Sequence, residues 1–143
     1  MIQIRLAESP ADIQLCLRLR WTVFVEEHGV PPSLEVDEHD SRDAVHALAL
    51  LDGVPCGAGR FVFTEPGVAK IQRMAVIDDA RGQGAGRALL DFLESEARRR
   101  GARTFTLWAH TRAKSLYEKA GYSAVGPVFD DAGLPHVRMD KPA

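Results

Sequence analysis

The sequence predicts an α+β fold in which a central mixed β-sheet is flanked by helices, and two observations support this prediction. Strand-like runs at residues 45–51 and 56–63 are joined through Asp52-Gly53, a dipeptide typical of tight hairpins, so these strands should pair antiparallel. A helical stretch then separates the apolar run 71–77 from the strand-like run 104–108, which favours a parallel pair. A chain that contains both kinds of pair forms a mixed sheet.

The chain has the size and composition of a single domain. Its 143 residues, 45% of them hydrophobic, supply one core, so residues 1–143 should fold as one unit. A formal net charge of -2 gives no general attraction to nucleic acid or to acidic membranes. No stretch approaches the roughly 20 apolar residues of a membrane span, and the two widely separated cysteines suit a reducing compartment. We therefore expect a cytoplasmic protein without nucleic-acid or membrane partners.

The N-terminal part of the chain is predicted to hold a strand, a long helix and an acidic segment. Residues 2–6 alternate between apolar and polar side chains, and Pro10 begins a helix whose apolar residues recur at helical spacing over 11–27. Residues 29–32, which read GVPP, end this helix. Five carboxylates then lie between residues 33 and 43. The simplest interpretation is a solvated loop or short helix, and the alternative is a negative wall that selects a cationic amine.

The central stretch of the chain is a predicted strand, loop and helix. After the strand 71–77 comes the loop 81–86, which reads RGQGAG, and then a helix with one apolar face that ends near Gly101. Glycines at alternate positions let the backbone approach a ligand closely and turn its N–H groups inward, beside the positive end of a helix. This pattern predicts an anion site suited to phosphate, with Arg81 and Arg87 placed to bind phosphate oxygens. The alternative is a glycine-rich tight turn that enters a helix, with Arg81 and Arg87 as ordinary solvated residues.

Two well-known phosphate-binding loops do not fit these residues. A Walker A loop requires a lysine followed by serine or threonine after its last glycine, and Arg87 and Ala88 stand there instead. A dinucleotide-binding fold requires a carboxylate at the end of the next strand, and the run 104–110 offers none. Nucleotide hydrolysis and nicotinamide or flavin cofactors are therefore not expected.

The C-terminal third is predicted to form a helix and a pair of strands. Residues 112–120 carry an apolar face that includes Tyr117, and Gly121 ends this helix. Strands are expected at 122–129 and 136–139, with a turn over 130–135 between them. These two strands would complete the sheet.

Three separated motifs give the chain a resemblance to a known family. They are Met74-Ala75-Val76, the loop 81–86, and residues 113–122, which read AKSLYEKAGY. In this order and spacing they resemble the GCN5-related N-acetyltransferase (GNAT) superfamily. The segments 20–40 and 133–139 are similar to a bacterial subgroup of small single-domain members. The resemblance implies an acyl-CoA N-acyltransferase fold over nearly the whole chain, with acetyl-coenzyme A as the cosubstrate.

The resemblance also implies roles for individual residues. The strand end at 74–76 would pair with the pantetheine arm, and the loop would hold the pyrophosphate. Tyr117 matches the family's general acid, which protonates the leaving thiolate, and the alternative for Tyr117 is a core aromatic. Where the family often has an asparagine, His110 would contact coenzyme A, act as a base, or only satisfy backbone groups. The expected cofactor-binding residues are Met74, Ala75, Val76, Arg81, Gly82, Gln83, Gly84, Ala85, Gly86, Arg87 and His110.

The base that deprotonates the acceptor has two sets of candidates. Glu26 and Glu27 lie near the helix end that borders the acceptor site in the family, and either would act through water. His136 and His46 are the alternatives, although a lone histidine on an apolar strand is usually hydrogen-bonded for structural reasons. No spacing of histidines, cysteines and carboxylates indicates a metal site.

Together these inferences predict an N-acetyltransferase that transfers an acetyl group from acetyl-coenzyme A to a primary amine by direct attack in a ternary complex. The acceptor would be a small amine or a peptide amine. A non-catalytic coenzyme A-binding sensor or interaction module is the alternative, while the charge balance speaks against a toxin that acetylates charged transfer RNA. The sequence leaves the oligomeric state open, a homodimer included.

Overall fold

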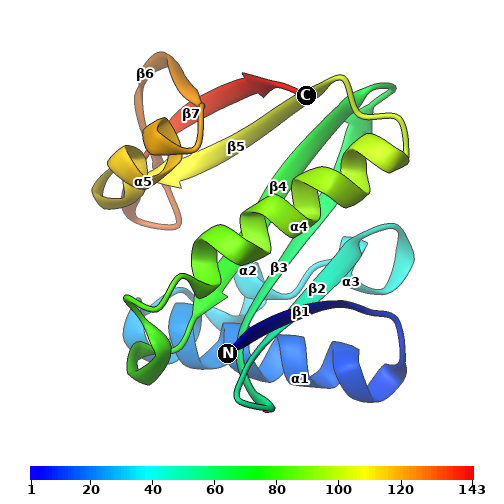
Figure 1. Cartoon of the computed structure of the whole chain (residues 1–143). Coiled ribbons are helices and arrows are strands. Elements are labelled where there is room, and N and C mark those ends of the chain that lie inside the picture. The colour runs from blue at the N-terminus through cyan, green and yellow to red at the C-terminus, as the bar shows by residue number, and fades with distance from the viewer.

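A seven-stranded mixed sheet, in the order β1-β2-β3-β4-β5-β7-β6, organises the computed structural model, which describes residues 1–143 (Figure 1). Its strands are β1 (Ile2–Ala7), β2 (Val45–Leu51), β3 (Val54–Glu65), β4 (Val68–Val76), β5 (Thr104–His110), β6 (Ser123–Asp131) and β7 (Leu134–Pro142). All neighbouring strands pair antiparallel except β4 and β5, which pair parallel. The prediction of a mixed sheet is confirmed.

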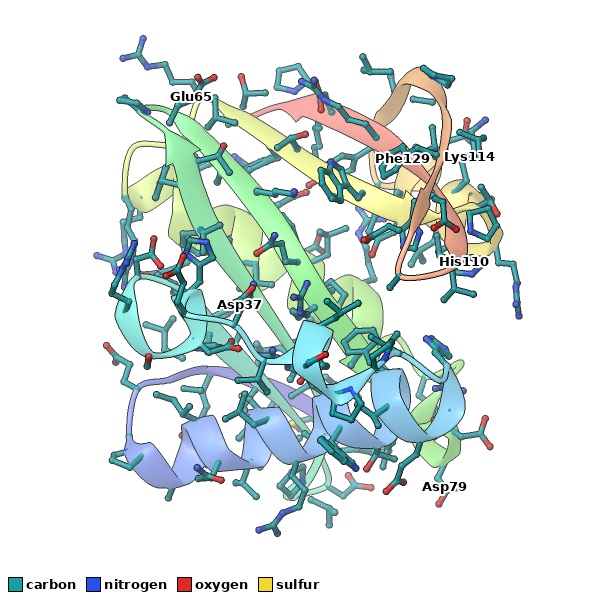
Figure 2. The ribbon with its side chains drawn as sticks, turned by 180° about the vertical axis from the view of Figure 1, so that it is seen from behind. Asp37, Glu65, Asp79, His110, Lys114 and Phe129 are labelled. Atoms are coloured by element: carbon teal, nitrogen blue, oxygen red, sulfur yellow. The ribbon has the colours of Figure 1, made fainter.

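Helices cover both faces of this sheet. They are α1 (Pro10–Arg20), the π-helix η1 (Trp21–Glu27), α2 (Pro32–Glu35), α3 (His39–Arg42), the short 3₁₀ turn η2 (Asp78–Ala80), α4 (Ala85–Arg99), the 3₁₀ turn η3 (Thr111–Ala113) and α5 (Lys114–Lys119). α4 crosses the front of the sheet in Figure 1, whereas α1, α2 and α3 lie on the opposite face, toward the viewer in Figure 2. On that face, α1 packs on β2, β3 and β4. On β5, the side chain of Trp108 is 47% exposed.

The main core lies between α4 and the sheet. Leu89, Leu90, Leu93 and Ala97 are fully buried, as the helical spacing predicts. The helix approaches β3 closely because glycines stand at positions 57 and 59, where added Cβ atoms would lie 3.1 Å from Cδ1 of Leu89 and 2.9 Å from Cδ1 of Leu93. The two glycines therefore let α4 pack directly on the backbone of β3.

The N-terminal helix changes its hydrogen-bond pattern along its length. Ser9 caps α1 by accepting a hydrogen bond from the Asp12 amide at 3.1 Å, and Pro10 stands at the first helical position. From Trp21 the helix continues as the π-helix η1, which ends at Glu27 before Gly29 takes a φ of 71°. The extent predicted for this helix is confirmed, and the π-helix is an addition of a kind often found at functional sites.

The end of the chain differs from the prediction in the length of its turn. The turn between β6 and β7 contains only Ala132 and Gly133, both with positive φ, so the turn predicted over 130–135 was too long. In the sheet, β7 lies between β5 and β6, a strand order that the sequence did not predict. This arrangement brings residues of β7 next to the end of β5. No helix in the structure combines the length and the apolar character that crossing a bilayer requires.

Candidate functional site

The two parallel strands separate halfway along their length. β4 and β5 pair only where Val68–Ile71 faces Thr104–Leu107. Beyond that point residues 72–76 have no partner on the β5 side, although Ala75 and Val76 still pair with β3. A strand edge without a partner presents backbone N–H and C=O groups that an extended ligand can bind. The predicted strand motif 74–76 lies on this open edge.

A bulge interrupts β4 just before this edge. The register with β3 shifts opposite Ala58 and Arg60, and Arg73 takes a φ of 57°, which is unusual for a residue with a side chain. The Arg73 guanidinium donates hydrogen bonds to the carbonyl oxygens of Glu35, at 3.0 Å, and Leu34, at 3.2 Å. These bonds offset the backbone strain and join the bulge to the segment 33–43.

The N-terminus of α4 is not capped by any side chain. Gly82 and Gly84 have φ of 78° and 89°, and the Ala88 amide makes the first hydrogen bond of the helix, to Gly84 O at 3.0 Å. The amides of residues 85–87 therefore have no acceptor within the helix. The three glycines are not equivalent, because only Gly82 and Gly84 adopt the left-handed conformation. The loop thus offers the unpaired N–H groups that an anion site requires.

The two arginines beside this loop are engaged with other protein groups. Arg81 donates to Val76 O at 2.9 Å and to both carboxylate oxygens of Glu27, at 2.8 and 3.0 Å. Arg87 donates to Asp91 at 3.0 Å, on the exposed side of α4. Arg81 therefore joins the loop to the end of β4 and to η1, while the half-exposed pair of Arg87 is of the weak surface kind.

Tyr117 lies at the opposite side of the opening, on α5. Its ring is buried and packs edge to face on Tyr122, with 5.9 Å between the ring centroids. Burial raises the pKa of the Tyr117 hydroxyl to about 12. The phenol therefore stays protonated at neutral pH and is able to donate a proton.

His110 is the last residue of β5 and caps the turn that follows. Its Nδ1 accepts a hydrogen bond from the Arg112 amide at 3.1 Å. Burial lowers the pKa of His110, and the nearby Arg112, His136 and His28 lower it further. Of the three roles left open by the sequence, the capping of backbone groups is thus present. Figure 2 shows His110 at the end of β5.

Aromatic side chains continue from His110 across the same face of the sheet. The rings of Trp108 and Phe129 meet edge to face, with their centroids 5.2 Å apart. Lys70 Nζ lies 3.2 Å from the centroid of the Trp108 ring, and burial lowers the pKa of this lysine. We call Trp108, Phe129 and the adjacent Lys70 the aromatic strip, and local sequence patterns do not predict it because its members come from three different strands.

A buried network of charges joins α1 and β3 to the segment 33–43, and no local pattern in the sequence predicts it. Arg20 donates to Glu35 at 2.6 Å and to Asp40 at 2.6 and 3.0 Å. Arg60 binds Asp37 through two bonds of 2.8 Å and Asp40 at 2.7 Å. Both arginines are essentially inaccessible to solvent. In Figure 2, Asp37 lies in front of β3 and β4.

This network decides how the acidic segment 33–43 is used. Burial by itself raises the pKa of Asp40, but the hydrogen bonds and charge of Arg20, with the charge of Arg60, hold it well below its usual value. Hydrogen bonds from Arg60 likewise lower the pKa of Asp37. The segment forms the short helices α2 and α3, and three of its five carboxylates pair with the buried arginines Arg20 and Arg60. These three do not form a free negative wall.

The candidate bases lie in different surroundings. His46 is buried, with Nε2 3.1 Å from Asp40 O, and burial lowers its pKa, so it belongs to the charge network. Glu26 and Glu27 are exposed at the end of η1, and Glu27 is held by Arg81. His136 lies on β7 directly opposite His110 on β5, with 5.5 Å between the ring centroids. Two of these four thus lie against residues of the predicted cofactor set: Glu27 pairs with Arg81, and His136 lies opposite His110.

Comparisons with known proteins agree with this geometry. The model of the acetyltransferase (GNAT) domain family matches residues 21–143. The chain is 34% identical over 137 residues to the uncharacterized N-acetyltransferase YjcF of Bacillus subtilis, covering 95% of this chain and 96% of that protein. The crystal structure of a candidate N-acetyltransferase from Lactobacillus plantarum is similar, with a TM-score of 0.90 and 30% identity over 99% of this chain and 97% of that one. An aminoglycoside 6'-N-acetyltransferase crystallised with coenzyme A shares the fold, with a TM-score of 0.76 and 21% identity over 99% and 96% of the two chains.

Proposed function

This chain belongs to the GNAT acetyltransferase family, and from that premise we propose that it transfers an acetyl group from acetyl-coenzyme A to a primary amine by direct attack in a ternary complex. The observation that carries the proposal is the separation of β4 from β5 beside the uncapped N-terminus of α4. The separated strand edge suits an extended amide chain, and the uncapped helix N-terminus suits a pyrophosphate. The acceptor is a small amine or a peptide amine, and the cytoplasmic location expected from the sequence is part of the same proposal.

The residues around the opening fit coenzyme A in two respects. The amides of residues 82–87 would bind the pyrophosphate, since no side chain caps the helix there. The free edge of Met74–Val76 would pair with the amides of the pantetheine arm as a short added strand. When bound, acetyl-coenzyme A supplies the thioester, and a backbone N–H near Val76 would polarise its carbonyl group.

Two side chains have proposed roles in the chemistry. Tyr117 gives its hydroxyl proton to the departing thiolate, as its protonated state at neutral pH allows. His110 contacts the bound cosubstrate from the end of β5. Glu26 or Glu27, acting through water, is the base that the sequence favours. Direct transfer needs a free acceptor beside the thioester, which the open end between β4 and β5 allows.

Binding and turnover can be tested separately. The purified protein should bind coenzyme A with a micromolar dissociation constant in calorimetry, and with acetyl-coenzyme A it should acetylate members of an amine panel in a thiol-release assay. Binding without turnover of any amine would favour the alternative, a coenzyme A sensor or interaction module. A protein that fails to bind coenzyme A would contradict both functions.

Replacing Gly84 with alanine should weaken coenzyme A binding. An alanine at a φ of 89° costs about 1–2 kcal/mol, and relief of this strain turns the adjacent amides away from the ligand. We expect the dissociation constant to rise by about tenfold or more. Gly53→Ala is the matched control, because Gly53 has a φ of 81° and open space around it at the β2-β3 turn. Equal effects of the two variants on coenzyme A binding would count against the loop as the anion site.

A further inference from the structure

Two histidines face each other at the open end of the sheet. The pairing of β5 with β7 places His110 opposite His136. Their neighbours Ala109 and Val137 point into the core, so the two rings lie on the other face of the sheet, the face of Trp108 and the aromatic strip. His110 is the last residue of β5, beyond the point where β4 and β5 separate. His110 therefore borders the opening, and His136 lies beside it on the next strand, β7.

Backbone hydrogen bonds fix the neutral tautomers of these rings in opposite senses. Nδ1 of His136 lies 2.9 Å from Leu134 O, and because a carbonyl oxygen only accepts, Nδ1 carries the hydrogen. Nε2 of His136 is then left with a free lone pair. Nδ1 of His110 accepts from the Arg112 amide, so in the neutral ring the hydrogen is on Nε2. One ring thus presents a proton acceptor and the other a hydrogen-bond donor.

A carboxylate stands where it would stabilise a protonated His136. Oδ2 of Asp131 lies 3.9 Å from Nε2 of His136, too far for a direct hydrogen bond in the structure but close enough for charge attraction. The imidazole itself is largely buried, with 14% of its side chain exposed. The groups that face it are Asp131 from β6, His110 from β5 and the ring of Phe129. The nearest carboxylate therefore lies beside the ring nitrogen that carries the free lone pair.

We propose that His136 is the general base that deprotonates the acceptor amine, with His110 as the adjacent donor and Asp131 as the group that stabilises the resulting imidazolium. This assignment rests on the proposed function and deepens it. The ammonium proton passes to Nε2 of His136, and the freed lone pair forms the C–N bond as the C–S bond breaks. Tyr117 gives its proton to the thiolate, and the second amine proton, lost as the amide forms, returns through solvent to Tyr117. His136 releases its proton to solvent, so one proton leaves per turnover.

The first test is His136→Asn assayed with two classes of acceptor. An asparagine amide still donates to Leu134 O, but it cannot take up a proton. A primary alkylamine is protonated at neutral pH and needs a base, whereas an aromatic amine is already neutral. We expect kcat/KM for the alkylamine to fall by about 10²-fold, with the aromatic amine changed by less than about threefold and coenzyme A binding retained. The alkylamine deficit should narrow as the pH rises and the amine loses its proton without help.

Controls separate a base from a structural residue. His39→Asn, on α3 and away from the opening, should leave the kinetics unchanged. His136→Gln serves as a second variant if the asparagine variant does not fold. Equal losses for both amine classes at every pH, or no loss, would overturn the proposal. An alkylamine-selective loss in Glu26→Gln or Glu27→Gln, and not in His136→Asn, would assign the base to η1 instead.

A second readout does not depend on turnover. Nitrogen-15 NMR of the wild-type protein, at a pH where both rings are neutral, should show the hydrogen of His136 on Nδ1 and that of His110 on Nε2. The reverse tautomer for His136 would refute the assignment directly. Failure of the proposed function is recognised separately, since the wild type would then bind coenzyme A but acetylate no amine, and the base assignment would fall with it.

Discussion

Tyr117→Phe should lower kcat by about 10²-fold or more while the melting temperature stays nearly unchanged. The substitution removes one hydroxyl and keeps the ring, so the packing on Tyr122 is preserved. Burial alone accounts for the raised pKa of Tyr117, about 12, which fits a hydroxyl held protonated for donation to a departing thiolate. Because the lost group acts only in the transition state, the KM for acetyl-coenzyme A should change little. Steady-state kinetics and a thermal melt measure the two quantities.

Tyr122→Phe provides the matched control for this prediction. The Tyr122 hydroxyl donates a 2.7 Å hydrogen bond to the buried carboxylate of Glu94, so its loss should cost about 1–3 kcal/mol of stability. It has no place in the reaction, and kcat should stay within about twofold. Tyr117→Phe should therefore lower kcat with little loss of stability, whereas Tyr122→Phe should lower stability with little loss of kcat. If both reduce kcat equally, Tyr117 is a core aromatic and another group protonates the thiolate.

Arg60→Ala should destabilise the protein by about 3–5 kcal/mol, enough to lower its melting temperature by about 10 °C or to prevent folding. The Arg60 side chain is fully buried, and its removal leaves Asp40 with one partner fewer and Asp37 without its two short bonds. The cost arises mainly at Asp40, because its buried carboxylate is then paired by Arg20 alone. Urea or thermal unfolding gives the magnitude. Arg5→Ala, which breaks the exposed pair with Asp12, is the control and should cost less than about 1 kcal/mol.

The cost of Arg60→Ala should also depend on pH in a defined direction. The arginines hold the pKa values of Asp37 and Asp40 below their usual range, so their stabilisation is fully present above the unfolded carboxyl pKa of about 4 and is lost as the pH falls below it. The gap in unfolding free energy between wild type and variant should therefore narrow on acidification. A gap that is the same at neutral and at strongly acidic pH would show that lost packing, not lost charge pairing, explains the destabilisation.

The parts of this structure that could be predicted are those with local signals. Asp52 and Gly53 both adopt positive φ at the β2-β3 turn, which is the conformation that this dipeptide favours. The apolar spacing of α4 and the glycines before it were also recognised in the sequence. The β6-β7 turn was predicted within 130–135, but its exact position was not, because Ala132 carries no turn signal even though it adopts a φ of 53°. The insertion of β7 beside β5 depends on long-range pairing, which no local pattern reveals.

In the candidate site, too, local motifs could be predicted and long-range contacts could not. The motif residues at 74–76 and 81–87 follow one another in the chain, so the sequence could place them together. The charge network joins α1, β3 and β4 to the segment 33–43, and nothing near Arg20 indicates that its partners are Glu35 and Asp40. His136 became the preferred candidate for the general base only because its register on β7 places it opposite His110. The spacing of residues in the sequence predicts neither the partners of Arg20 nor the pairing of His136 with His110.

The anchoring of the acidic segment has a consequence for how this protein can diversify. α2 and α3 have only four residues each, and the segment that carries them is fastened by arginines that belong to the core, Arg20 and Arg60, and by Arg73 at the bulge of β4. The residues that hold this segment in place are thus also residues on which folding depends. A new acceptor preference would be hard to obtain by exchanging this segment alone, and directed evolution should find its tolerated changes on the aromatic strip instead.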